Sequence, residues 1–307
     1  MPLILDSKRL DVTMSPAEIL QMHPQLQDRA KALTSQQTKT FGPKGFLYVQ
    51  QREFAVTTPS DRFISIMGSE DATTCHILVL RHTGSGATCL AHCDGSDTEI
   101  EVASILHSVK TLTKSSSEGR FELHIVGGFI DQRQLSQKLS SELLKAFDNL
   151  PDEVHLLTFC VSEINDKEEN GVHFPIIYGI AVNVKTAQIF KATFQDRGPC
   201  EDLRSAYSLA GGAMVNIYDF HTGELSFGPY CWTPFAIPNI DFWLKQEDDL
   251  ILQYFSTSPQ AEPPHFVAHM RSALEFLKAH PYPMKFLFPD DKPLFYKKNV
   301  DGLWEKI

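Results

Sequence analysis

The sequence predicts an α+β fold in which helices cover mixed, largely antiparallel sheets, arranged as an α-β-β sandwich. In the first half, segments with strand and helix patterns follow in the order strand, strand, helix, strand, helix, strand. That order places the helices on one face of a mixed sheet. The second half is rich in hairpin patterns and predicts a further sheet packed on the first. A hydrophobic content of 42% and a charged content of 21% are typical of a globular protein with a substantial core.

The N-terminal part of the chain predicts one helix followed by two strands. Ser15 is suited to the N-cap, Pro16 to the first helical turn and Glu18 to the third position, where its side chain completes a capping box. Strand patterns then cover residues 45–54 and 62–67.

Helices and strands alternate in the middle of the chain. Ser96 and Glu99 match a capping box, which predicts a helix. Its buried side is predicted to contain Ile100, Ala103, Leu106, Val109 and Thr113. A second helix is predicted after Asp131, where apolar residues recur at a spacing of four: Leu135, Leu139, Leu143 and Phe147. The strands predicted around this helix are residues 121–126 and 154–161.

The charged segment 164–172 is predicted to be a surface loop and the best internal boundary. We expect one compact domain over residues 1–307, with a catalytic half at about 41–163 and a second half at about 172–307 packed on it. The second half is predicted to contain strands at 176–184, 189–194, 213–220 and 224–230 and helices at 201–209 and 264–280.

One hairpin carries the candidate chemistry. Apolar segments at 76–80 and 87–91 are joined by a turn at 83–86. Cys75 stands just before the first strand and His92 just after the second, so an antiparallel hairpin brings them to the same open end. A cysteine nucleophile needs a base within hydrogen-bond reach, and this arrangement supplies one.

The same residues have simpler interpretations. A buried free cysteine is often only a small apolar residue, and a histidine at a strand end is often a polar cap. Polar residues surround both positions, which favours the mouth of a site over a core strand: Ser69, Glu70, Asp71, Thr73 and Thr74 precede Cys75, and Asp94 follows His92.

A zinc-binding or scaffold protein is the alternative from another functional class. Cys75, Cys89, His92 and Cys93 are the candidate ligands. Strand residues four apart lie on one side but ~13 Å from each other, which makes convergence of Cys89 and Cys93 on one ion difficult. We therefore expect no metal at the site.

Two segments of this hairpin carry a family resemblance. S-E-D-A-T-T-C-H and C-L-A-H-C-D-G, together with the chain as a whole, resemble the protein N-terminal asparagine amidohydrolases. A more distant similarity is to bacterial chemoreceptor glutamine deamidases, whose cysteine is followed by a histidine 17 positions later and preceded by a threonine six positions earlier. Cys75 and His92 match that spacing, and Ser69 replaces the threonine with another hydroxyl.

The resemblance implies an activity and roles for these residues. It implies deamidation of N-terminal asparagine to aspartate with release of ammonia, with Cys75 as nucleophile, His92 as base and Ser69 as the residue that orients the imidazole. No cofactor is required. The expected partners are proteins or peptides with a free N-terminal Asn, and the product is expected to feed the N-degron branch of ubiquitin-dependent degradation.

Substrate-binding candidates lie around the nucleophile and at the chain start. They are Thr74, Glu70 and Asp94, together with Pro2 if the N-terminal strand tucks the terminus against the site. Acidic residues are suited to the free α-ammonium group of the substrate.

Composition excludes several other classes. The formal net charge of −10 argues against nucleic acid and anionic membranes as partners. No apolar run approaches the ~20 residues of a membrane span, and the start lacks a secretory signal. Six cysteines without a framework spacing indicate reduced thiols, so we expect a cytoplasmic monomer.

Overall fold

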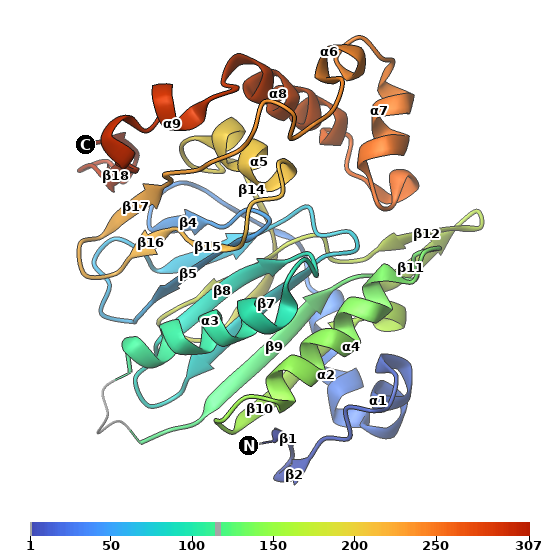
Figure 1. The fold of residues 1–307 in the computed structure, drawn as a ribbon. Coiled ribbons are helices and arrows are strands. Elements are labelled where there is room, and N and C mark those ends of the chain that lie inside the picture. Colours follow the sequence, from blue (N-terminus) through green and yellow to red (C-terminus); the bar gives the residue numbers. More distant parts are fainter. Residues whose placement is uncertain (1, 114–117) are drawn as a thin grey trace.

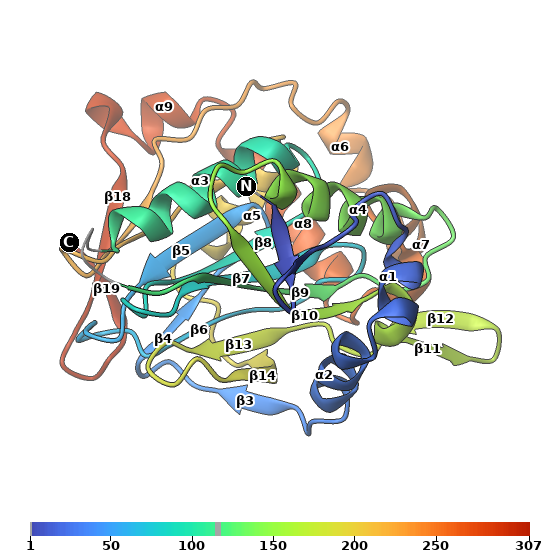
Figure 2. The same ribbon diagram turned by 90° about the horizontal axis from the view of Figure 1, so that it is seen from below.

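The computed structural model describes residues 2–113 and 118–307 and has three layers in its central part. Helices α3 (Thr98–Thr111) and α4 (Leu135–Asp148) cover one face of an eight-stranded mixed sheet (Figure 1). A five-stranded sheet lies against the other face, so that Figure 2 shows helices, first sheet and second sheet in succession. The predicted α+β class is confirmed.

Strands distant in sequence lie next to each other in both sheets. The first sheet has the order β15 (Val215–Asn216), β5 (Glu53–Thr57), β8 (Thr88–Cys93), β7 (His76–His82), β9 (Phe121–Gly127), β10 (Val154–Val161), β1 (Leu3–Leu5) and β2 (Lys8–Arg9). The second has the order β3 (Lys39–Phe41), β14 (Ile189–Phe194), β13 (Ile180–Asn183), β6 (Ile66–Ser69) and β4 (Phe46–Tyr48).

The two layers of core follow from strand alternation. On β7, Leu78 and Leu80 pack toward the helices, whereas Ile77 and Val79 pack toward the second sheet. Successive side chains of a strand point to opposite faces, so a sheet buried on both sides reads as a continuous apolar run. This explains why β7 and β8 are almost entirely buried.

The remaining elements surround this sandwich. Of the helices that the structure describes, two come before the second sheet in the chain, α1 (Pro16–Met22) and α2 (Pro24–Thr34). Five others lie together at one end of the sandwich (Figure 1): α5 (Glu201–Leu209), α6 (Ile240–Trp243), α7 (Asp248–Phe255), α8 (Phe266–Ala279) and α9 (Pro283–Phe286). A four-stranded sheet has the order β16 (Tyr218–Asp219), β17 (Glu224–Phe227), β18 (Leu294–Lys298) and β19 (Trp304–Lys306). In the described part of the chain, no helix is long and apolar enough to cross a membrane.

Helix starts show one correct and one wrong prediction. The capping box at Ser15 and Glu18 is confirmed, with both reciprocal hydrogen bonds present. The box predicted at Ser96 and Glu99 is wrong, since the helix is preceded by Asp97 and has no side-chain cap. Ile100 is accordingly 64% exposed, and the buried face is formed by Glu101, Val102, Ile105, Leu106 and Val109.

The charged segment after residue 163 is not a loop. It forms the hairpin β11 (Asp166–Glu169) and β12 (Val172–Pro175), which projects from the body of the molecule (Figure 1). Beyond it, β13 pairs with β6 and β14 pairs with β3, so the two halves of the chain share one sheet. The interpretation of residues 1–307 as one domain stays a prediction.

Candidate active site

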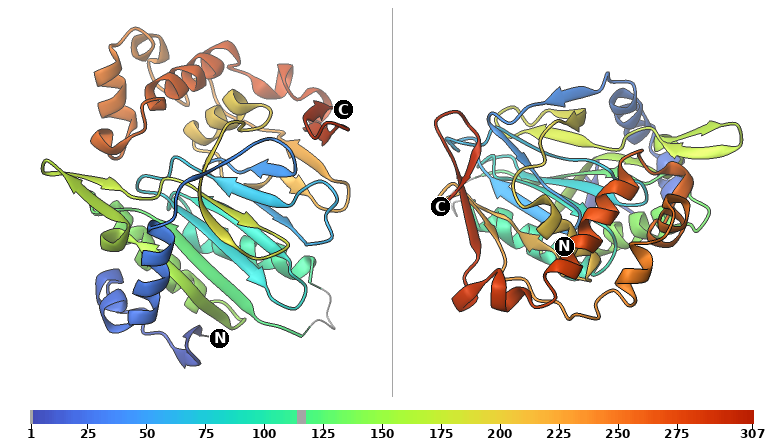
Figure 3. Two further views of the ribbon diagram at one scale, coloured as in Figure 1. Left: turned by 180° about the vertical axis from the view of Figure 1, so that it is seen from behind. Right: turned by 90° about the horizontal axis from the view of Figure 1, so that it is seen from above.

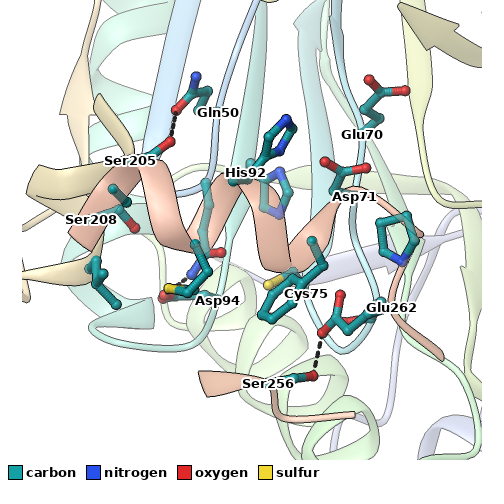
Figure 4. Close-up of a pocket in the computed structure, with 18 of the residues that line it drawn as sticks. Gln50, Glu70, Asp71, Cys75, His92, Asp94, Ser205, Ser208, Ser256 and Glu262 are labelled. Atoms are coloured by element: carbon teal, nitrogen blue, oxygen red, sulfur yellow. Dashed lines mark hydrogen bonds between the residues drawn. The ribbon is translucent and has the colours of Figure 1, made fainter. Parts of the chain in front are cut away.

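The β7–β8 hairpin brings Cys75 and His92 to one cavity. Cys75 immediately precedes β7, and His92 pairs with Ile77 across the hairpin. Residues 75 and 77 share a face of the strand, so Cys75 lies one diagonal step from His92 on the side facing the second sheet. Both line a cavity of about 370 Å³, and Figure 4 shows them between Asp94 and Glu262.

The Gly127–Gly128 pair at the end of β9 holds the backbone of Cys75. Gly128 N–H donates to the Cys75 carbonyl over 3.1 Å. A Cβ atom at Gly127, whose φ is +142°, would collide with that carbonyl oxygen. Gly127 thus allows the two backbones to approach closely, and Gly128 provides a backbone donor beside the cysteine.

A hydrogen bond across the two sheets orients His92. Ser69, at the end of β6 in the second sheet, lies 2.7 Å from His92 Nδ1 through its Oγ. Both side chains are buried. Among the described residues, His92 Nε2 has no hydrogen-bond partner. The hydrogen bond with Ser69 thus engages Nδ1 of His92 and leaves Nε2 as the nitrogen without a partner in the described chain.

Burial determines the protonation states of this pair. Desolvation raises the pKa of the Cys75 thiol well above its usual value, and the nearby carboxylates Asp94 and Glu262 raise it further. Desolvation also lowers the pKa of His92 to about 4. At neutral pH the resting site therefore contains a neutral thiol and a neutral imidazole, because an ion pair is costly in this environment.

The cavity contains more negative than positive charge. Four carboxylates line it, those of Glu70, Asp71, Asp94 and Glu262, against the two guanidinium groups of Arg52 and Arg197. Such a cavity is suited to a ligand that carries a positive charge.

The predicted substrate-binding residues all lie on the cavity, except Pro2, but two of them already have strong partners. Asp94 accepts from Arg52 Nε at 2.6 Å and from Gln51 Nε2 at 2.8 Å. Glu70 accepts from Arg197 and from Thr193.

Thr74 lies on the same cavity wall and its hydroxyl is also engaged. Its Oγ1 is 2.8 Å from that of Thr257, beyond the end of α7.

Glu262 is the cavity acid that the sequence analysis missed. It accepts from Ser256 Oγ over 2.5 Å, and no basic side chain forms an ion pair with it among the described residues. Desolvation raises its pKa to about 7. It lies far from Cys75 in sequence, in a segment between α7 and α8 that carries no motif, so only the fold brings it to the site.

Pro2 lies at the wrong end of the molecule. It precedes β1, whose Leu3 pairs with Val154 at the start of β10. Val154 pairs with Phe121, which lies opposite His82 at the far end of β7 from Cys75. Figure 3 shows the N-terminus and α8 at opposite ends, so the prediction of Pro2 as a substrate-binding residue was wrong.

The zinc alternative is also contradicted. Cys89 and Cys93 belong to the core beneath the helices, whereas Cys75 packs in the core between the sheets. The sheet itself separates these thiols. The group of residues suited to a metal within the described chain is a different one, Asp71, His265 and His269.

Comparison with known proteins decides the family. The profile of the family described as protein N-terminal asparagine amidohydrolase matches residues 36–306. The chain belongs to this family. It is therefore a hydrolase, which agrees with a cavity that contains a cysteine and a histidine.

Similar proteins cover the chain from end to end. The protein N-terminal asparagine amidohydrolase of Mus musculus is 60% identical over all 307 residues, which span 98% of the mouse protein. That of Homo sapiens is 59% identical with the same coverage. The protein of the same name from Arabidopsis thaliana is 29% identical over 85% of this chain and 81% of its own length.

Proposed function

We propose that this enzyme hydrolyses the side-chain amide of an N-terminal asparagine, using Cys75 as the nucleophile. The observation that carries the proposal is the joint position of Cys75 and the Ser69–His92 hydrogen bond in a negatively charged cavity. The names of the similar proteins support the choice of substrate.

The proposed reaction uses the free nitrogen of His92. Nε2 takes the proton of the Cys75 thiol as sulfur attacks the side-chain amide carbon of the substrate. The imidazolium then returns the proton to the leaving nitrogen, and the C–N bond breaks. Ammonia is released, and the substrate remains bound to Cys75 as a thioester. Water, deprotonated by the same Nε2, breaks the thioester to give aspartate and the thiol. Ser69 keeps the ring oriented through Nδ1.

The substrate's own charge is proposed to activate the thiol. In the empty cavity, Asp94 and Glu262 oppose ionisation of Cys75. A substrate ammonium group placed among these carboxylates compensates their charge and lowers the pKa of Cys75. The thiolate would then form chiefly when a free N-terminus is bound, which favours terminal over internal asparagine.

Glu262 is the acid that we propose for the ammonium group. Asp94 and Glu70 are engaged by arginines, whereas Glu262 is hydrogen-bonded to the hydroxyl groups of Ser256 and Thr73 and forms no ion pair with a basic side chain in the described chain. A buried carboxylate without a cation is unfavourable until a cation binds. Glu262 therefore replaces Asp94 and Glu70 as the first candidate.

The cellular assignments follow from the proposed product. An N-terminal aspartate is a destabilising residue after arginylation, so we propose a role in the N-degron branch of ubiquitin-dependent degradation. We propose the cytoplasm as the compartment and a monomer as the active form.

The decisive experiment compares matched peptides that begin with Asn, Gln or N-acetylated Asn. We expect ammonia release and a one-dalton mass gain for the Asn peptide only. The extra methylene of Gln moves the amide carbon by about 1.5 Å, and acetylation removes the charge that activates the thiol. Cys75→Ala should abolish turnover, while Cys231→Ala, which removes an exposed thiol, should not change kcat/KM. Similar rates on the acetylated peptide would contradict recognition of the N-terminus.

A further inference from the structure

A second group of polar side chains lies beside the cavity, whose wall includes two of its three members, Asp71 and His269. Asp71, His265 and His269 each offer a ligand atom, and these atoms lie within 4.8 Å of one another. His265 and His269 are four residues apart at the start of α8, so both imidazoles lie on the same face of the helix. Asp71 comes from the segment between β6 and β7 and lines the cavity together with His269.

The partners of this cluster leave one histidine contact unsatisfied. His265 Nε2 is 2.9 Å from Asp71 Oδ2 and 3.0 Å from Asp71 Oδ1, which requires that the nitrogen donate a proton. The same nitrogen is 3.2 Å from Arg197 Nη2, which requires that it accept one. One ring nitrogen cannot do both. A cation bound to the lone pair of Nε2 and to the Asp71 carboxylate would resolve this conflict.

The charge around the cluster also favours a divalent cation. Arg197 is the one positive side chain among three carboxylates, at 2.9 Å from Glu70, 2.7 Å from Asp71 and 3.8 Å from Glu201. Counted without the two histidines, these three acids exceed the arginine by two charges. Arg197 approaches Asp71 through Oδ2, whereas Oδ1 contacts only His265 among the described residues, so an ion bound to Oδ1 and Nε2 would replace the proton that they share.

We propose that Asp71, His265 and His269 bind a divalent first-row metal ion such as Zn²⁺, and that the bound ion inhibits the enzyme. Two imidazoles and a carboxylate are ligands that zinc accepts, with a water in the fourth position. Ligand atoms of a tetrahedral zinc lie about 3.4 Å apart, so the present spacing requires only side-chain rotation. The ion would lie against the cavity wall that Asp71 and His269 form, and its positive charge would oppose binding of the substrate ammonium group.

Binding is tested by titrating Zn²⁺ into the Cys75→Ala variant in a calorimeter. That variant lacks the thiol as a competing ligand, and binding is scored without any activity, so the result is independent of the proposed function. We expect one bound ion, with His265→Ala and His269→Ala each weakening binding at least tenfold. His107→Ala, on the exposed side of α3, is the matched control and should bind normally. Absence of binding, or full binding in both His265 and His269 variants, would overturn the site.

Inhibition is tested in enzymes that retain Cys75. Zn²⁺ should raise KM for the Asn peptide, and a chelator should restore it. In His269→Ala, the concentration needed for inhibition should rise at least tenfold relative to that variant's own metal-free rate. Equal inhibition of wild type and His269→Ala would place the inhibiting ion on Cys75 and overturn the regulatory role.

Discussion

At the level of single residues, the orientation of His92 depends on one hydroxyl from the other sheet. Ser69 is fully buried, and its Oγ lies 2.7 Å from His92 Nδ1. Solvent water therefore has no access to this position to take over the hydrogen bond of the hydroxyl. If Nδ1–H donates to this oxygen, Nε2 is the nitrogen that carries a lone pair toward the cavity. The tautomer of the proposed base is thus decided by a residue that never meets the substrate.

Removing that hydroxyl should lower activity without unfolding the protein. We expect Ser69→Ala to reduce kcat at least tenfold, but by less than the 10²–10⁴-fold loss expected for His92→Ala. Ser69→Thr should retain most of the activity, because it keeps a hydroxyl at the same position. Steady-state kinetics on the Asn peptide measure both. Wild-type kcat in Ser69→Ala would remove Ser69 from the proposed mechanism.

Glu262 gives a prediction for pH dependence. Its pKa is raised to about 7, so the carboxylate takes up a proton as the pH falls through that value. If the carboxylate binds the substrate ammonium, KM should rise below pH 7. Glu262→Gln should have a high KM at every pH and lose this step. A normal KM in Glu262→Gln would show that other groups bind the ammonium.

The raised pKa of Glu262 also predicts how the folding stability of the protein depends on pH. A carboxyl whose pKa is raised on folding binds more protons when folded, so its contribution to stability falls as the pH rises from about 4.5 to 7. Glu262→Gln should therefore have a higher melting temperature than wild type at pH 8 and a similar one at pH 5. Thermal unfolding at the two pH values distinguishes this effect from a general packing change.

At the level of elements, α5 is anchored to the first sheet by a buried ion pair. Arg204 donates to both carboxylate oxygens of Glu53 on β5, at 2.9 and 2.7 Å, and to the carbonyl of Tyr48. Both charged side chains are 3% exposed. Because α5 contributes Ser205 and Ser208 to the cavity wall, this pair couples stability to the shape of the site.

Breaking the pair should be costly. Arg204→Ala leaves the Glu53 carboxylate buried without a partner, and we expect a loss of about 3–5 kcal/mol in the free energy of unfolding. The double variant Arg204→Met, Glu53→Leu should lose less than the single one, since no isolated charge remains. Lys110→Ala, which removes an exposed ion pair with Asp152, is the control and should change little. Urea denaturation provides the comparison.

At the level of the whole molecule, the N-terminus lies at the opposite end of the sandwich from α8 (Figure 3), the helix that contributes His269 and Met270 to the cavity wall. A peptide tag placed before residue 1 should therefore leave kcat/KM for the Asn peptide within about twofold of the untagged value, because no part of the tag is near Cys75. The unfolding curve provides the control. A tagged protein that unfolds normally but loses activity would contradict the position of the terminus.

Local patterns in the sequence were sufficient for most of the elements and for placing the proposed nucleophile beside the proposed base. Turn residues and apolar segments located the β7–β8 hairpin, and chain direction alone brought Cys75 and His92 to the same end. The hydrophobic pattern failed at α3, where Ile100 is exposed, because a helix with apolar residues on several sides does not reveal which face meets the sheet. The spacing of His265 and His269 was available in the sequence and was overlooked.

What the sequence determined by itself was therefore the α+β class, the family and the proximity of the proposed reacting pair, since these depend on neighbours in the chain and on a recognisable motif. Only the tertiary structure decided which distant acids meet that pair and which end of the sheet receives the terminus. Glu262 reaches the cavity and Ser69 reaches His92 from separate elements, and the parallel pairing of β1 with β10 places Pro2 away from the cavity. Such long-range contacts arise from the packing of whole elements, which no local pattern of residues encodes.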